Sequence, residues 1–137
     1  MTNMRYEAPT TLNDAISLLS NATGDAWVLA GGTDLLVQLR AEMIQPELVV
    51  DIKRIPELNA IVNDGGVFKI GAVTPCAIID EDKDLKKAWP GVVEASELIG
   101  STQIQGRASL GGNLCNASPA ADTVPALTAA GATITIA

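Results

Sequence analysis

The sequence predicts a mixed α+β fold, and three observations support this prediction. Residues 27–51 have the pattern strand, glycine loop, helix, strand, for which a parallel strand pair is the default arrangement. After residue 56 the pattern changes to alternating apolar residues on both sides of Asp64-Gly65-Gly66, which is typical of a β-hairpin. Helical patterns then recur over residues 74–130. The change near residues 52–57 predicts a division into two parts, 1–55 and 56–137.

The first part is predicted to consist of a helix followed by a strand–helix–strand unit. Pro9-Thr10-Thr11 and the apolar spacing after it predict a helix with Thr10 or Thr11 as its cap. The short apolar run at 27–30 predicts a buried strand that leads into a glycine loop. Residues 34–40 predict a helix with Leu35, Leu36 and Leu39 facing inward, and residues 48–51 predict the second strand.

The second part is predicted to combine the hairpin with short helices. The hairpin strands are expected over about residues 58–63 and 67–71, and Thr74-Pro75 predicts the start of a short helix. The charged run 80–84 is expected to be a solvated loop. Residues 90–99 and 122–130 predict helices, with Gly100 closing the former. Residues 133–136 alternate and predict a final strand, whose edge a further segment or a partner would cover.

The composition argues against several classes of function. The chain has 137 residues, enough for one ordinary domain, and 47% of them are hydrophobic but only 3% aromatic. With 9 basic and 16 acidic residues the net charge is −7, which disfavours binding to nucleic acids and to anionic membranes. The chain contains no histidine, the commonest general base and metal ligand. Acid–base or zinc chemistry centred on this chain is therefore not expected, and no catalytic or metal-binding residue is assigned.

The sequence shows no targeting signal and predicts a cytoplasmic protein. It has no basic start followed by an apolar run, and no apolar stretch approaches the roughly 20 residues that a membrane span needs. The two cysteines, Cys76 and Cys115, do not have metal-ligand spacing. Free thiols in a reducing compartment are therefore the expected state.

The first glycine-rich segment, residues 29–36, has two interpretations. A strand ends, Gly31-Gly32 turns the chain, and a helix begins at Thr33 or Asp34, so its free N–H groups are placed to bind a phosphate. An ordinary strand-to-helix turn capped by Thr33 or Asp34 is the other interpretation. The pattern matches neither the Rossmann nor the Walker loop.

The second glycine-rich segment, Ser109-Leu110-Gly111-Gly112-Asn113, also has two interpretations. It is either a second phosphate-binding loop or a simple β-turn or bulge. The small polar residues that follow, up to Ser118, favour a groove for a flat polar cofactor. Asp122 is placed either to accept a hydrogen bond from a ribose or ribityl hydroxyl or to cap a helix. Together the two segments are expected to hold the two phosphates of a dinucleotide through main-chain amides.

These segments resemble the FAD-binding medium subunit of molybdenum hydroxylases, a family that includes xanthine dehydrogenases, aerobic carbon monoxide dehydrogenases and 4-hydroxybenzoyl-CoA reductases. The resemblance is carried by Ala30-Gly31-Gly32-Thr33-Asp34-Leu35 and by the run from Ser109 to Asp122. The opening, Tyr6-Glu7-Ala8-Pro9-Thr10-Thr11-Leu12, is similar to the start of that family. The similarity spans nearly the whole chain, and the second motif is the more specific.

The resemblance implies an FAD-binding fold of the vanillyl-alcohol-oxidase (PCMH) type. Residues 1–55 would form its small N-terminal α/β subdomain, and residues 56–137 the start of a larger subdomain built on an antiparallel sheet. Family members carry a further C-terminal subdomain, which is expected to be absent here. In the family the first segment wraps the FAD pyrophosphate and the second approaches the flavin. The implied cofactor-binding residues are Leu29, Ala30, Gly31, Gly32, Thr33, Asp34, Leu35, Leu36, Ile99, Ser109, Leu110, Gly111, Gly112, Asn113 and Asp122.

The resemblance also implies a role in electron transfer. A large subunit would carry the molybdenum cofactor and a small subunit the iron–sulfur clusters, from which electrons would pass to FAD on this chain and then to NAD or a quinone. The isolated chain is expected to be inactive. The alternative is a non-catalytic assembly module that has kept the first half of the fold and lost flavin binding.

Overall fold

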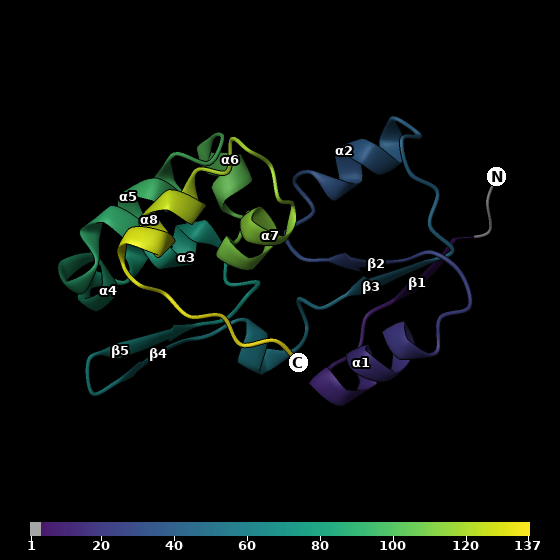
Figure 1. Ribbon diagram of the computed structural model, residues 1–137, viewed down its shortest axis with the longest axis horizontal. Coiled ribbons are helices and arrows are strands. Elements are labelled where there is room, and N and C mark those ends of the chain that lie inside the picture. Colours follow the sequence, from purple (N-terminus) through teal and green to yellow (C-terminus); the bar gives the residue numbers. More distant parts are fainter. Residues whose placement is uncertain (1–3) are drawn as a thin grey trace.

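A three-stranded parallel sheet forms the core of the first half of the computed structural model, which describes residues 4–137. Its strands are β1 (Arg5–Glu7), β2 (Ala26–Leu29) and β3 (Leu48–Asp51), in the order β1-β3-β2 (Figure 1). In the ladder Val50 pairs with Glu7 on one side and with Val28 on the other. All four residues of β3 are buried, as its central place requires. The parallel pair predicted over residues 27–51 is confirmed.

Two helices lie on opposite sides of this sheet (Figure 1). Helix α1 (Leu12–Ser20) begins where predicted, because Thr11 Oγ1 accepts a hydrogen bond from the Asp14 amide. Its Ala15 packs with Leu48, Val50 and Ile55 of the first hydrophobic cluster. Helix α2 (Leu35–Arg40) covers the other side.

The expected burial of α2 is only partly correct. Leu35 and Leu39 are half-buried, but Leu36 is 43% exposed and Val37 is more exposed still. Six residues make fewer than two helical turns, so α2 can turn only a narrow stripe toward the sheet.

The second half begins with the predicted hairpin. A short 3₁₀ turn, η1 (Pro56–Leu58), precedes strands β4 (Ile61–Asp64) and β5 (Val67–Ile70), which pair antiparallel. Gly65 and Gly66 both have positive φ, the backbone that a two-residue hairpin turn requires. The first strand starts later than predicted because Pro56 initiates η1.

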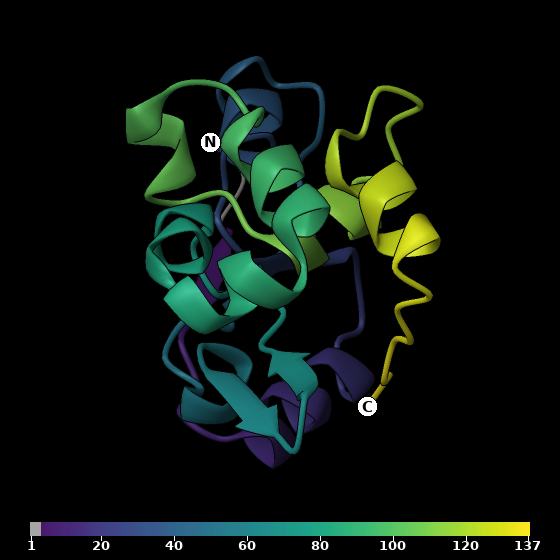
Figure 2. The ribbon, with the colours of Figure 1, turned by 90° about the vertical axis from the view of Figure 1, so that its left-hand side faces the viewer.

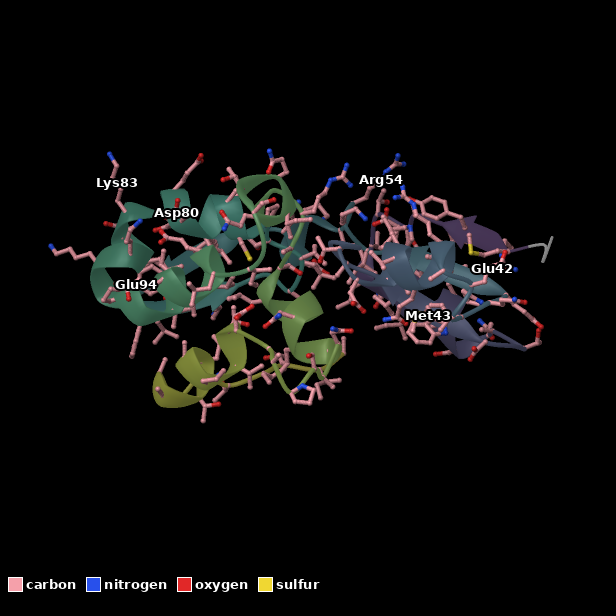
Figure 3. All side chains as sticks on the ribbon, turned by 90° about the horizontal axis from the view of Figure 1, so that it is seen from above. Glu42, Met43, Arg54, Asp80, Lys83 and Glu94 are labelled. Atoms are coloured by element: carbon pink, nitrogen blue, oxygen red, sulfur yellow. The ribbon has the colours of Figure 1, made fainter. Side chains whose placement is uncertain are left out.

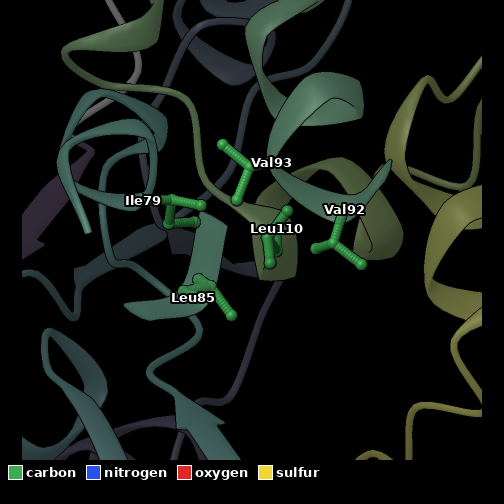
Figure 4. Packing of buried hydrophobic residues seen from close by; sticks show 5 residues of the cluster. All are labelled: Ile79, Leu85, Val92, Val93 and Leu110. Atoms are coloured by element: carbon green, nitrogen blue, oxygen red, sulfur yellow. The ribbon is translucent and has the colours of Figure 1, made fainter. Parts of the chain in front are cut away.

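Six short helices follow the hairpin and pack over it (Figures 1 and 2). They are α3 (Cys76–Glu81), α4 (Lys83–Ala88), α5 (Pro90–Glu97), α6 (Thr102–Gln105), α7 (Leu110–Cys115) and α8 (Thr123–Ala129). The second hydrophobic cluster consists of Ile79, Leu85, Val92, Val93 and Leu110 (Figure 4), and hairpin residues including Phe68 pack against it. As predicted, Gly100 has a positive φ just after α5.

Two predicted elements of the second half are wrong. Residues 80–84 do not form a loop, because Asp82 caps α4 through a hydrogen bond of 2.8 Å from the Leu85 amide to its Oδ1. Figure 3 shows that Asp80 and Lys83 lie with Glu94 at one end of the molecule, at the surface. Residues 133–136 do not form a strand, since they find no strand to pair with among residues 4–137.

Three further findings concern the described residues only. None of the helices within residues 4–137 has the length and apolar character that a membrane crossing demands. The same part of the chain contains no group of three or more cysteine and acidic residues placed to bind a metal ion. Both cysteines are free, Cys76 buried and Cys115 exposed.

Candidate functional site

The two glycine-rich segments, 80 residues apart in sequence, lie against each other in the structure. A Cβ atom added to Gly31 would overlap the carbonyl group of Arg107 and lie 3.1 Å from Cα of Ala108. A Cβ added to Gly112 would lie 3.5 Å from Cβ of Ala30. The juxtaposition that a shared ligand requires is therefore present, and Gly31 allows the close backbone approach.

The first segment presents a run of unpaired main-chain donors. Among residues 4–137, no partner accepts from the amides of Gly31, Gly32, Thr33 or Asp34. The amide of Leu36 donates to the Gly32 carbonyl, so the intrahelical bonds of α2 begin only beyond this run. Gly32 has a φ of 80°, the left-handed conformation that turns successive N–H groups toward one side.

The side chain of Asp34 does not occupy these donors. It makes no capping bond to α2 and instead accepts a hydrogen bond from Nε2 of Gln38, one turn further along the helix. The interpretation of residues 29–36 as a turn capped by Asp34 is therefore wrong. Because its carboxylate is directed to Gln38, the acidic residue leaves the amide run open to an anion.

The second segment is the first turn of helix α7, not a loop, turn or bulge. Ser109 caps the helix, with its Oγ accepting from the Gly112 amide at 3.1 Å. The Gly111 amide donates to the Ala72 carbonyl at 3.1 Å. The expectation that Gly111 and Gly112 offer free amides is thus wrong. Gly111 is required for packing, since an added Cβ would lie 2.7 Å from Cβ of Ala72.

Asn113 and Asp122 have different environments. Asn113 Oδ1 accepts from Thr123 Oγ1 at 2.6 Å and from the Thr123 amide at 3.3 Å, and so joins α7 to α8. Asp122 is exposed and makes no capping bond to α8, because its own backbone is already helical. The cap interpretation of Asp122 is not realised, and its carboxylate is open to solvent.

The apolar members of the expected site lie inside the protein. Leu29 and Leu110 are buried, and Leu110 belongs to the second hydrophobic cluster. Ile99 is 9% exposed and packs with Cys76 and Ala108 directly beneath the second segment. Burial raises the pKa of the Cys76 thiol to about 11, which makes it unreactive.

Sequence reasoning missed three residues, Tyr6, Asp51 and Lys53, which form a hydrogen-bonded group that contacts the first segment at Ala30. Tyr6 is the middle residue of β1 and Asp51 the last residue of the neighbouring strand β3, and the Tyr6 hydroxyl donates to Asp51 Oδ2 at 2.6 Å. Lys53 Nζ forms an ion pair with Asp51 Oδ1 at 2.9 Å and donates to the Ala30 carbonyl at 3.0 Å. The sequence did contain one indication of this network: Asp51 is a charged residue at the end of the apolar strand predicted over residues 48–51.

The environment of Asp51 keeps it ionised. Burial, the largest effect, raises the pKa of this carboxyl, but the hydrogen bonds from Tyr6 and Lys53 together outweigh it and the pKa lies below its usual 3.8. The bond to Asp51 in turn raises the pKa of Tyr6 above 10.0. The carboxylate at the end of β3 is therefore charged at neutral pH.

A pocket of about 660 Å³ lies elsewhere, between β1 and α1. Arg5, Asp14, Gly24 and Glu47 are among its lining residues, and neither glycine segment contributes to it. Within residues 4–137 no buried side-chain polar atom lacks a hydrogen-bond partner. The open amides of the first segment are the stronger candidate site.

Comparisons with known proteins identify the family to which the chain is similar. Residues 2–137 match the family model described as the FAD binding domain in molybdopterin dehydrogenase. The medium chain of carbon monoxide dehydrogenase from Hydrogenophaga pseudoflava is 36% identical over 125 residues, which cover 91% of this chain and 43% of that one. The caffeine dehydrogenase subunit beta of a Pseudomonas species is 33% identical over 129 residues, covering 94% and 44%.

Solved structures of carbon monoxide dehydrogenases are also similar to this chain. The carbon monoxide dehydrogenase of Hydrogenophaga pseudoflava superimposes with a TM-score of 0.81 at 34% identity, over 85% of this chain and 41% of that one. The reconstituted CO dehydrogenase of Oligotropha carboxidovorans gives 0.82 at 33% identity, over 88% and 42%. The chain thus spans less than half the length of these relatives. It belongs to the family of FAD-binding domains of molybdopterin dehydrogenases.

Proposed function

We propose that this chain is the FAD-binding part of an electron-transfer subunit in a molybdenum-containing dehydrogenase. The observation that carries the proposal is the run of unpaired amides from Gly31 to Asp34, held against the start of α7 in a chain of this family. Successive N–H groups of this kind form an anion-binding concavity without any cationic side chain.

The residues present fit a diphosphate. Within residues 4–137 four main-chain donors lack an acceptor, the buried Gly31 among them, and the adjoining segment carries only small residues at Gly111 and Gly112. We assign the pyrophosphate of FAD to the amides of residues 31–34, together with the hydroxyl of Thr33. Ser109, which is 2% exposed, accepts from the Gly112 amide through its Oγ and so fixes the start of α7 beside these donors.

Other residues orient the cofactor. The exposed Asp122 carboxylate is a suitable acceptor for a sugar or ribityl hydroxyl. Asn113 acts by joining α7 to α8 and so fixes the place of Asp122 relative to the first segment. Ile99 supports the second segment from its buried side.

Bound FAD supplies the electron-transfer chemistry, and the protein supplies binding, orientation and electrostatics. The chain has no histidine, and we assign none of its residues as a catalytic acid or base. Its task is to hold the dinucleotide in a fixed place. Residues 1–55 and 56–137 would act as two lobes of a vanillyl-alcohol-oxidase-type fold.

We infer partners from the names of the relatives, which are a medium chain and a subunit beta. A large subunit would carry the molybdenum cofactor and a small one the iron–sulfur clusters, with NAD or a quinone as the final acceptor and the cytoplasm as the location. The isolated chain would not turn over substrate. The alternative of an assembly module without flavin finds no support in the comparisons.

The test is the flavin content of the purified native complex and of two glycine variants. Gly32 and Gly65 both have positive φ, so Gly32→Ala and Gly65→Ala introduce comparable backbone strain, of about 1–2 kcal/mol. The two sites differ in free space, since an added Cβ would lie 2.9 Å from Cδ1 of Leu29 at Gly32 but meets nothing within 4 Å at Gly65, in the exposed turn between β4 and β5.

We expect the wild-type complex and G65A to contain FAD, and G32A to have lost most of it. Flavin absorption after removal of free cofactor measures the outcome. A wild-type complex without flavin, or equal FAD retention in both variants, would contradict the assignment.

A further inference from the structure

One polar network connects all three strands of the parallel sheet around Asp51, the last residue of β3. Tyr6 comes from β1, Asp51 from β3, and Ala30 directly follows β2. Lys53 joins them, because its ammonium group contacts both the Asp51 carboxylate at 2.9 Å and the Ala30 carbonyl at 3.0 Å. The Lys53 amide also donates to Asp51 Oδ1 at 3.0 Å, so both the main chain and the side chain of Lys53 contact this carboxylate.

The bond to Ala30 fixes the plane of one particular peptide. The carbonyl of Ala30 and the amide of Gly31 belong to the same peptide group, and the described chain has no cis peptide bond. In a trans peptide the C=O and N–H vectors point in opposite directions. Because the carbonyl is held toward Lys53, the Gly31 amide is directed away from it. This amide is the first of the unpaired run.

The other side of this peptide is equally constrained. Gly31 packs so closely against the backbone of Arg107 and Ala108 that a Cβ atom does not fit there. A rotation of the Ala30–Gly31 peptide would have to break the Lys53 bond within this restricted space. The amide direction is thus set by an ion pair on one side and by backbone contact on the other.

Stability alone does not account for a charged pair at this place. Asp51 is only 7% exposed, and burying a carboxylate is costly even when it is paired. Well-packed apolar residues commonly replace such a pair without loss of stability. Apolar residues could not replace the hydrogen bond from Lys53 Nζ to the Ala30 carbonyl, which holds the first glycine segment.

We propose that Tyr6, Asp51 and Lys53 form a positioning network that directs the Gly31 amide and thereby sets the affinity of the first glycine segment for a diphosphate. Lys53 is the positioning residue, Asp51 holds its ammonium group, and Tyr6 holds Asp51. This inference rests on the proposed function.

The test compares Lys53→Met with Lys69→Met in the full-length subunit. Lys69 is also paired with an aspartate, Asp64, at 3.4 Å, but both are exposed on the hairpin. FAD is titrated into the apoprotein and followed by quenching of flavin fluorescence. We expect K53M to bind FAD about tenfold more weakly, as the loss of one charge-assisted hydrogen bond implies, and K69M to bind as wild type.

A second readout separates positioning from general destabilisation. The ³¹P resonances of bound FAD report the donors around each phosphate, and a merely structural role would leave them unchanged in the saturated complex. We expect K53M to shift them, Lys53→Arg to restore much of the affinity because it keeps a cationic donor, and K69M to match wild type.

The outcomes are distinguishable. If the wild type does not bind FAD, the proposed function itself fails. If the wild type binds FAD and K53M binds equally well with the same ³¹P spectrum, only the network is refuted. If K53M does not fold, Tyr6→Phe decides: a weaker FAD affinity with shifted resonances supports the network, and unchanged values overturn it.

Discussion

The contact between the two glycine-rich segments is best tested by replacing Gly31 with alanine. Gly31 does not have a positive φ, so the substitution brings no left-handed strain, and its effect comes from space alone. The new methyl group would lie 2.7 Å from the carbonyl carbon of Arg107 and 3.1 Å from Cα of Ala108. Both are backbone atoms, which cannot move aside as a flexible side chain can.

The structure gives the size of the effect. Carbon atoms in contact lie about 3.5–4.0 Å apart, so the two segments must separate by about 1 Å. Overpacking of this kind costs about 1–3 kcal/mol of unfolding free energy. The separation also moves the unpaired amides of the first segment away from α7. We therefore expect FAD to bind about tenfold more weakly or worse, the loss of at least one hydrogen bond to a charged group.

Gly91→Ala is the matched control. Gly91 lies in the first turn of α5, where an added Cβ meets nothing within 4 Å, so this variant should be as stable as wild type or up to about 1 kcal/mol more stable. Urea denaturation and FAD titration of full-length protein measure both quantities. If G31A matches G91A in stability and FAD affinity, the close contact between the segments does not exist in solution.

Three further predictions concern single residues. Ser109→Ala removes the cap of α7 and should cost about 1 kcal/mol in urea denaturation, whereas Ser101→Ala should cost less, because the Ser101 side chain makes no capping bond. A thiol reagent should label one cysteine in the native protein, the exposed Cys115, and also Cys76 after unfolding; two labelled thiols in the native state would refute the burial of Cys76. The stability from ionised Asp51 is complete above its unfolded pKa of 3.8 and is lost as pH falls through its lower folded pKa. The stability difference between wild type and Asp51→Asn should therefore narrow below about pH 4, and a gap independent of pH would contradict this.

Sequence patterns predicted the elements whose evidence is local. The strand–helix–strand unit follows from apolar runs on either side of a glycine pair, and the hairpin from Gly65-Gly66 between alternating residues. The cap at Thr11 needs only the next three residues. Such signals lie within a few residues of the feature they specify.

The errors arose where tertiary contacts decide. Residues 133–136 have strand propensity, but a strand also needs a neighbour to pair with, and residues 4–137 provide none. Gly111 looked like a phosphate-binding glycine, but its amide and its missing side chain are both used against Ala72, about forty residues away. No local pattern indicates that partner.

In the candidate site, too, local features could be predicted from the sequence and long-range contacts could not. The sequence identified the first glycine segment, yet the role of Lys53 depends on a bond to Ala30, 23 residues earlier, and on Tyr6, 45 residues before Asp51. A lysine two positions after a strand is ordinary by itself. The pairing of β2 with β3 is what brings Lys53 close to the first glycine segment.

The strand order β1-β3-β2 has a consequence for synthesis on the ribosome. Among residues 4–137, strands β1 and β2 pair only with β3, the last of the three to be made. Until residues 48–51 have left the exit tunnel, the two earlier strands have no partner, and the first hydrophobic cluster lacks Leu48 and Val50. We therefore expect nascent chains that stall before Leu48 to lack this sheet, which assembles in one late step.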